Sequence, residues 1–151
     1  DVEASPRRPI LIGGGVGVPP LYGLAKALLA KGIAPVVALG FNTADDQFYV
    51  EEFQALGCET LLATADGSAG EKGLVTSLVG KTGCDYCFCC GPTPMLKGVY
   101  ALPMLTGGQY SFEERMGCGF GACVGCTVHT SGGPRRVCAD GPVFRREEIV
   151  W

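Results

Sequence analysis

The sequence predicts an α/β fold: a parallel five-stranded sheet with helices on both faces, followed by a small C-terminal subdomain that contains a β-hairpin. Two observations predict it. Over the first 111 residues, short apolar stretches of strand length alternate with segments of helical periodicity. After Glu114 the composition changes, since residues 117–126 hold four Gly and three Cys. Strand–helix alternation is typical of βαβ units, whose strands run parallel, so we expect one domain over 1–111 and a cysteine-rich subdomain over 112–151.

The individual elements follow from local patterns. The expected strands are apolar stretches with β-branched or aromatic residues, at 9–12, 35–41, 60–64, 86–90 and 109–112. The expected helices lie between them, at 20–31, 47–56, 74–79 and 94–105. Asp45 or Asp46 is expected to cap the second helix, and Gly57 to end it. In the subdomain, 127–130 and 136–139 are expected to form a hairpin around a turn at 131–134.

The charge balance bears on possible partners. The chain has 151 residues, with 12 Lys and Arg against 15 Asp and Glu, and a net charge of −3. This mild balance offers no basic field for nucleic acid. No apolar run approaches the roughly 18 residues of a membrane span, and the start does not resemble a signal peptide. We therefore expect a cytoplasmic protein with neither nucleic-acid nor membrane partners. The arginine pairs at 7–8, 135–136 and 145–146 are expected to be exposed turn charges.

The cysteines indicate redox or metal chemistry. There are nine, an odd number, in a chain without a recognisable export signal, which argues against a disulfide framework. The single histidine, His129, excludes a zinc site with two histidines and a Rieske-type cluster. Four cysteines are spaced C-x(4)-C-x(2)-C-x(11)-C, namely Cys118, Cys123, Cys126 and Cys138. The first three match the plant-type ferredoxin spacing for a [2Fe–2S] cluster, and interleaved glycines would let backbone N–H groups face the sulfurs. A zinc ribbon or buried structural cysteines are the alternatives, although only Cys123 and Cys126 form a short knuckle typical of zinc.

Three segments at the expected carboxyl ends of strands indicate a nucleotide site. The run GGGVG at 13–17 joins the first strand to the first helix, where a pyrophosphate could meet backbone N–H groups. It is not a complete G-x-G-x-x-G motif, because its third site is Val18. Cys90, Gly91 and Pro92 follow the strand at 86–90. Thr64 and Asp66 lie in a turn that either borders the nicotinamide or is an ordinary polar turn.

The acidic residues favour NAD over NADP. The stretch between Lys31 and Lys72 contains seven Asp and Glu and no Lys or Arg. It covers the ends of the second and third strands, where the adenosine ribose would lie. A 2′-phosphate needs a cationic partner there, usually Arg, so the sequence predicts NAD as the cofactor.

These motifs resemble a known family. The glycine run at 13–17 together with CGPTPM at 90–95 resembles the pyridine-nucleotide domain of the ferredoxin–NADP reductase superfamily. The segment RMGCGFGACVGC at 115–126, followed by VCADGPVF at 137–144, resembles the electron-transfer subunits of type B (NAD-linked) dihydroorotate dehydrogenases. The resemblance covers essentially the whole chain, and the cysteine segment is its most specific part.

The resemblance implies an electron relay in pyrimidine biosynthesis. A catalytic FMN subunit would oxidise dihydroorotate, and electrons would pass through the [2Fe–2S] cluster and FAD to NAD⁺, in a heterotetramer of the two subunits. It also implies site residues. Cys118, Cys123, Cys126 and Cys138 would bind iron. Gly14, Gly15 and Gly17 would approach the pyrophosphate, Cys90, Gly91 and Pro92 would lie by the nicotinamide and flavin, and Glu113 would face the flavin edge.

In that family a flavin-binding β-barrel precedes the nucleotide domain, and the expected first strand here begins close to Asp1. We therefore expect a fragment without the barrel, which would hold FAD poorly and be inactive alone. Two other functions remain open. One is a flavin and iron–sulfur subunit of a ferredoxin:NADP or sulfide-type oxidoreductase. The other is a zinc-stabilised nucleotide-binding module without catalytic activity.

Overall fold

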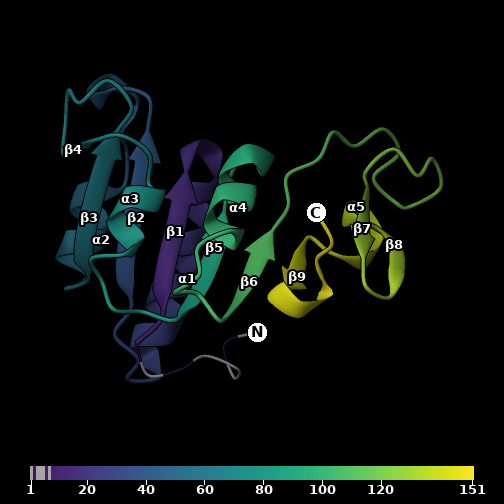
Figure 1. The fold of residues 1–151 in the computed structure, drawn as a ribbon, viewed down its shortest axis with the longest axis horizontal. Helices are drawn as coiled ribbons and strands as arrows, with labels where there is room; N and C mark the ends of the chain where they lie inside the picture. Colours follow the sequence, from purple (N-terminus) through teal and green to yellow (C-terminus); the bar gives the residue numbers. More distant parts are fainter. Residues whose placement is uncertain (1, 3–5, 7) are drawn as a thin grey trace.

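A computed structural model of the protein describes residues 2, 6 and 8–151. Residues 1, 3–5 and 7, which fall in the predicted domain 1–111 and include Arg7, lie outside the described residues. The fold is built on a seven-stranded sheet with the order β4-β3-β2-β1-β5-β6-β9 (Figure 1). Its strands are β1 (Ile10–Gly14), β2 (Val36–Phe41), β3 (Glu59–Thr64), β4 (Glu71–Lys72), β5 (Tyr86–Cys90), β6 (Gly107–Ser111) and β9 (Val143–Arg145).

The five strands expected from the sequence form the parallel centre of this sheet. β3, β2, β1, β5 and β6 pair in parallel along their lengths, which confirms the predicted α/β fold. The predicted strand number was too small, because β4 adds a parallel strand beside β3 and β9 an antiparallel strand beside β6. Strands β4 and β9 are too short for the alternation of apolar and polar residues that would mark a strand in the sequence. In β9 only Phe144 is buried.

Helices cover both faces of the sheet, as predicted. On one face lie α1 (Val18–Ala30) and α2 (Val50–Ala55), and on the other α3 (Thr76–Val79) and α4 (Thr93–Tyr100). Strand β1 alternates between them, with Leu11 in the core beneath α1 and Ile10 and Ile12 in the core beneath α4. Each side chain is fully buried. The sheet is therefore buried by a hydrophobic core on each face, and the carboxyl ends of its parallel strands lie along one edge.

Several expected boundaries were wrong, for local reasons. Helix α4 ends at Tyr100 rather than at 105, since Pro103 disfavours helical geometry at the residue before it. Helix α2 begins at Val50, after Tyr49 in a left-handed conformation with φ 65°. The expected Asp45 or Asp46 cap of this helix was wrong: both lie in a separate 3₁₀ turn (Ala44–Asp46). Gly57 follows α2 with φ 80°, a backbone conformation suited to glycine.

The C-terminal part contains the predicted hairpin with a corrected second strand. β7 (Thr127–Thr130) pairs with β8 (Gly133–Arg136) around a two-residue turn. The expected strand at 136–139 was wrong, since α5 (Val137–Asp140) is a short helix. Its first turn is stabilised by the Asp140 carboxylate, which accepts the backbone N–H of Arg136 at 2.8 Å. Cys138 therefore lies on a helix rather than on a strand.

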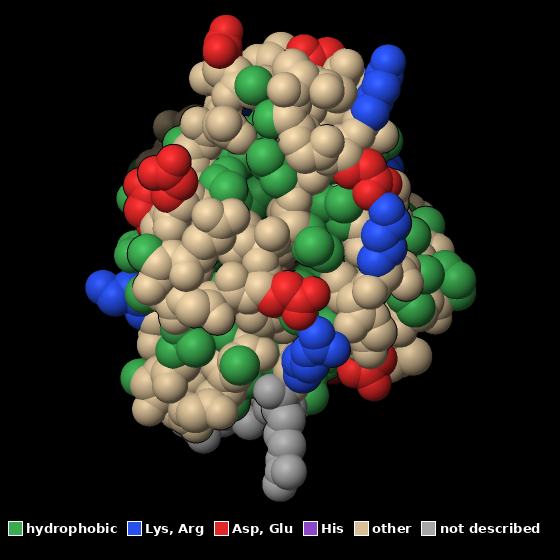
Figure 2. All heavy atoms as spheres, turned by 90° about the vertical axis from the view of Figure 1, so that its left-hand side faces the viewer, with side chains coloured by type: hydrophobic (Ala, Val, Ile, Leu, Met, Phe, Trp, Pro, Cys, Tyr) green, Lys and Arg blue, Asp and Glu red, His purple; other side chains and the backbone are tan. Residues whose placement is uncertain are grey.

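The C-terminal part packs on the sheet. Val137, Phe144 and Ile149 belong to the same hydrophobic cluster as Ile10 and Cys87. In Figure 1 the yellow β9 lies beside β6, whereas β7, β8 and α5 lie beyond it. On the face shown in Figure 2, acidic and basic side chains are scattered among neutral ones. None of the described helices has the length and hydropathy required to cross a membrane.

Candidate functional site

A cavity of about 620 Å³ opens at the carboxyl ends of the parallel strands. Its walls come from the turn after β1, the ends of β2 and β3, the segment before α3 and the start of α4. Among its lining residues are Gly14, Gly15, Asp46, Phe48, Pro92 and Met95. Ligands of open parallel sheets bind outside these strand ends, beside a β–α turn, so this cavity is the candidate nucleotide site.

Gly14 and Met95, which line the cavity, pack tightly with Gly91 beside it. A Cβ on Gly14 would lie 2.6 Å from Sδ of Met95, and a Cβ on Gly91 would lie 2.6 Å from its Cε. Gly91 also has φ 155° and would bring a Cβ to 3.1 Å from the Gly14 carbonyl oxygen. The thioether therefore lies against both glycine-containing turns. The sequence pattern marks the glycines, whereas the role of Met95 as part of the wall appears only in the structure.

Gly17 has a different environment from Gly14 and Gly15. It is buried, does not line the cavity, and a Cβ on it would overlap the backbone carbonyl of Cys90. The turn before α1 thus packs directly on the end of β5. The absence of a side chain at Gly17 is required by this packing.

Thr64 and Asp66 build the turn after β3 and do not line the cavity themselves. The buried Thr64 hydroxyl donates to the Ala69 carbonyl at 2.7 Å and accepts the Ala69 N–H at 3.0 Å. The Asp66 carboxylate accepts the side-chain O–H and backbone N–H of Ser68, and these hydrogen bonds lower its pKa. Ser68 Oγ in turn accepts the N–H of Ala44 at 2.7 Å, which ties this turn to the segment that carries Asp46.

A second cavity, also of about 620 Å³, lies at the ends of β5 and β6. Cys90, Ser111 and Glu113 line it together with Pro20 from α1 and Met116. Sγ of Cys90 lies 3.9 Å from Oε1 of Glu113, so the structure brings these two predicted site residues together. Burial raises the pKa of the Cys90 thiol, and the Glu113 charge adds to this effect, whereas a hydrogen bond from Ser111 opposes it. The thiol is therefore neutral at physiological pH.

The four cysteines of the predicted cluster lie in two pairs. The backbone N–H of Cys123 donates to Sγ of Cys118 at 3.5 Å, and that of Cys138 donates to Sγ of Cys126 at 3.5 Å. N–H groups of Cys123, Phe120 and Ala122 lower the pKa of Cys118 to about 6. Cys126 likewise has a lowered pKa, chiefly through the Cys138 N–H, and a hydrogen bond with the Cys126 side chain raises the pKa of Cys138. Two of the sulfurs are thus stabilised as thiolates, the form that binds metal.

The loop that carries Cys118, Cys123 and Cys126 has an unusual backbone conformation. Gly119 and Gly121 have φ values of 75° and 91°, and Val124 has φ 55°, which is unusual for a β-branched residue. Within residues 2, 6 and 8–151, no group of three or more His, Cys, Asp or Glu side chains is placed to hold one metal ion. The four thiols are the kind and number of ligands that an iron–sulfur cluster takes.

The expectation that all the paired arginines are exposed turn charges was wrong for Arg136 and Arg146. Arg136 is half-buried, and its guanidinium donates to the Gly121 carbonyl at 3.0 Å, which ties the cysteine loop to the hairpin. Arg146 is also half-buried, with hydrogen bonds to Tyr110 and Tyr100. Arg8 is exposed as expected, and pairs with Glu59 at 2.8 Å. Long-range partners of this kind leave no signal in the local sequence.

Comparison with known proteins shows which proteins this chain is similar to. Residues 113–150 match the model of the iron–sulfur cluster binding domain of dihydroorotate dehydrogenase B. The chain is 46% identical over 99% of its length to the dihydroorotate dehydrogenase B (NAD(+)) electron transfer subunit of Bacillus pumilus, and similarly to that of Geobacillus kaustophilus. It spans 59% and 60% of those two proteins. These similarities confirm the predicted resemblance.

Solved structures confirm the fold. A structure of an NADH-dependent reduced ferredoxin–NADP oxidoreductase, concerned with flavin-based electron bifurcation, matches with a TM-score of 0.83 and 37% identity. The match covers 95% of this chain and 54% of that one. The cytochrome b5 reductase domain of Ulva prolifera nitrate reductase matches with a TM-score of 0.54 and 22% identity, over 62% of this chain and 42% of that chain. The second likeness concerns the fold alone.

Proposed function

We propose that this chain is the nucleotide- and cluster-binding part of an electron-transfer subunit of an NAD-linked dihydroorotate dehydrogenase. It would relay electrons from an FMN-containing catalytic subunit, through a [2Fe–2S] cluster and FAD, to NAD⁺. The observation that carries this proposal is the pairing of Cys118 with Cys123 and of Cys126 with Cys138, within the segment that matches an iron–sulfur domain.

The four cysteines would be the iron ligands. Such a cluster carries single electrons and nicotinamide accepts only hydride, so a flavin is needed between them. Backbone N–H groups of the chain favour the thiolate forms of Cys118 and Cys126, above all that of Cys118. The same N–H groups would stabilise the negative charge of the bound cluster. Residues 112–151 would then form the cluster-binding subdomain and 1–111 the NAD-binding domain.

The cavity beside β1 would bind NAD. Gly14 and Gly15 would leave room for the pyrophosphate. Gly17 would allow the turn after β1 to pack on the end of β5, which holds Gly14 and Gly15 in the cavity wall. Asp46 is among the described residues that line this cavity, and no Lys or Arg is. A 2′-phosphate would meet negative charge there without a cationic partner, which supports NAD over NADP.

The second cavity would receive the reacting rings. Cys90 lines this cavity and would contact the nicotinamide, together with Gly91 and Pro92 that follow it in the chain, and Glu113 would lie at the flavin edge. The neutral thiol of Cys90 offers an uncharged, polarisable surface to a ring. Thr64 and Asp66 would act indirectly, by holding the turn at the cavity edge.

FAD would be held jointly with a flavin-binding barrel of the kind that the resemblance implies. We propose that this chain by itself does not transfer hydride, and that the active form is a cytoplasmic heterotetramer with the catalytic subunit. The relatives named above are electron transfer subunits, about 60% of whose length the chain spans.

A second function is supported by the likeness to the NADH-dependent reduced ferredoxin–NADP oxidoreductase, at 37% identity. The electron partner separates the two functions, because that protein is itself described as NADH-dependent. We expect the full subunit to be reduced by NADH, poorly by NADPH, and to exchange electrons with an FMN-containing catalytic subunit. Electron exchange with ferredoxin and none with such a subunit would favour the ferredoxin-linked function.

The cluster is tested by anaerobic purification of the full subunit. We expect about two irons and two sulfides per chain, with the spectrum of a [2Fe–2S] centre. Cys123→Ser should abolish that spectrum, whereas Cys58→Ser, at a buried cysteine outside the loop, should preserve it. A colourless protein that contains one zinc would replace the proposal with the zinc-stabilised module.

A further inference from the structure

Arg146 belongs to the C-terminal segment, yet its guanidinium contacts the nucleotide-binding part of the fold. It begins the 3₁₀ turn Arg146–Glu148, directly after β9. Nη1 donates a hydrogen bond to the hydroxyl oxygen of Tyr110 at 3.0 Å, and Nη2 donates to the carbonyl oxygen of Tyr100 at 2.8 Å. The guanidinium carbon also lies 4.1 Å from the centre of the Tyr100 ring. One side chain thus makes three directed contacts.

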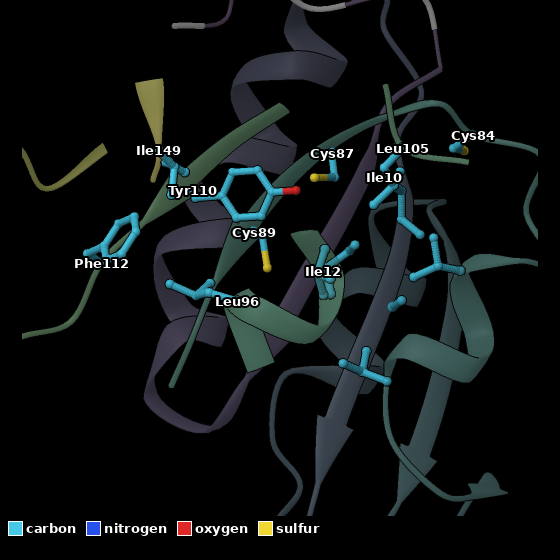
Figure 3. Packing of buried hydrophobic residues seen from close by; sticks show 14 of the residues in the cluster. Ile10, Ile12, Cys84, Cys87, Cys89, Leu96, Leu105, Tyr110, Phe112 and Ile149 are labelled. Carbon is cyan, nitrogen blue, oxygen red and sulfur yellow. The ribbon is translucent and has the colours of Figure 1, made fainter. Parts of the chain in front are cut away.

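Both partners are rigid parts of the sheet domain. Tyr100 is the last residue of α4, and carbonyls at a helix C-terminus lack helical partners and attract positive charge. Tyr110 lies in β6 and is completely buried. Figure 3 shows its hydroxyl pointing toward the sulfur of Cys87 on β5, with Ile149 from the C-terminal segment beside its ring. Arg146 therefore reaches groups that cannot shift without disturbing α4, β5 and β6.

The cysteine segment is attached to the sheet close to this point. Cys138 lies on α5, and β9 follows it and pairs with β6 over three residues only. Arg146 comes immediately after β9, so its three contacts extend that short pairing. A planar guanidinium that bonds to two oxygens and stacks on a ring defines orientation as well as attachment, which a lysine ammonium cannot do.

We propose that Arg146 is a positioning residue, which fixes the cysteine-bearing segment relative to the nucleotide-binding sheet. This rests on the proposed function, since its purpose would be to set the distance between the cluster and the flavin. Loss of the guanidinium would leave the thiol pairs and the nucleotide cavity intact, because neither contains Arg146. The geometry between them would become variable.

The test uses the full electron-transfer subunit with its flavin and cluster, under anaerobic conditions. Arg146→Met and Arg146→Lys are compared with Arg135→Met, a control at an exposed arginine of β8. After mixing with NADH, flavin bleaching should keep its wild-type rate in all variants. Cluster reduction, measured by freeze-quench electron paramagnetic resonance, should be slower by about tenfold to 100-fold in both Arg146 variants. The reason is that a misplacement of about 1 Å between reacting groups can lower a rate by about 100-fold.

A second readout does not depend on turnover. Hydrogen exchange should become faster in α5 and β9 of both Arg146 variants and stay unchanged in β1 and β5. Wild-type cluster reduction and exchange in Arg146→Lys with full cofactor content would overturn the proposal. If Arg146→Met loses its cofactors, Tyr110→Phe serves in its place, since it removes one of the three contacts and should give an intermediate rate. A failure of the proposed function is recognised separately, because the wild-type subunit would then lack iron and sulfide.

Discussion

The thiol of Cys90 lies against the carboxylate of Glu113, with 3.9 Å between Sγ and Oε1. The contact arises because Cys90 ends β5 and pairs in register with Ser111 on β6, so that Glu113 follows two residues beyond. Both side chains line the second cavity. The two predicted site residues are therefore neighbours through strand pairing, despite their separation along the chain.

This contact predicts how Cys90 reacts. Burial is the main cause of its raised pKa, and the Glu113 charge adds to it. Glu113→Gln removes that charge, so the thiolate should form at lower pH and alkylation at pH 9 should be faster, by up to about tenfold for one unit of pKa. Peptide mass spectrometry measures the rate at each cysteine. Cys58, whose pKa is raised by burial alone, is the internal control. Equal Cys90 rates in the two proteins would contradict the prediction.

The buried thiols also predict a loss of stability at alkaline pH. Burial raises the pKa of Cys87 from 9.0 to about 11, so the folded protein holds this proton more tightly than the unfolded chain. Stability from this group is complete below pH 9 and is lost as the pH rises toward 11, by about 3 kcal/mol. Urea unfolding between pH 8 and 11 measures the slope, and Cys87→Ala should flatten it. The same slope in both proteins would show that other groups control it.

The packing of Met95 predicts the effect of a methyl group at Gly14. Gly14 has an extended backbone, φ −138°, so Gly14→Ala adds no backbone strain but pushes Met95 aside. We expect a cost of about 1–3 kcal/mol and weaker NADH binding. Met95→Ala in the same protein should recover most of the loss. Gly23→Ala, in open space on α1, is the control and should stabilise the helix. Additive effects of Gly14→Ala and Met95→Ala would argue against their contact.

Gly17 should tolerate a side chain much less than Gly14 does. The Cβ of Gly17→Ala meets the backbone of Cys90, which cannot rotate away as the Met95 side chain can. We expect a loss of stability of about 3 kcal/mol or more, measured by chemical unfolding, and no recovery on adding Met95→Ala. Recovery by that second change would show that the two glycines share one environment.

Asp46 should contribute to the choice of nucleotide. Asp46→Asn keeps the size of the side chain and removes the charge from the cavity wall. The ratio of NADH to NADPH affinity in the full subunit should fall by about tenfold, which corresponds to about 1.4 kcal/mol. Asp45→Asn is the matched control, because Asp45 is adjacent and does not line the cavity. A fall of the same size in both variants would indicate a general effect of charge.

Local pattern was sufficient for the elements with long apolar faces. The parallel strands β1, β2 and β5 were predicted because their side chains are buried on both sides, which leaves continuous apolar runs. The two unexpected strands have two and three residues, and their existence depends on the partner strand alone. The hairpin was expected, but its turn is shorter than predicted, and the second strand therefore ends before Cys138.

The cysteine spacing and the glycine run at 13–17 are local sequence patterns, and they predicted an iron–sulfur cluster and a nucleotide cofactor without any knowledge of the fold. The amino-acid order could not say that Cys126 would meet Cys138, that Met95 would lie on Gly14, or that Arg146 would reach Tyr110. Such contacts join segments up to dozens of residues apart. Their energy is gained only when the chain has collapsed on a shared core, and for that reason only the folded molecule reveals them.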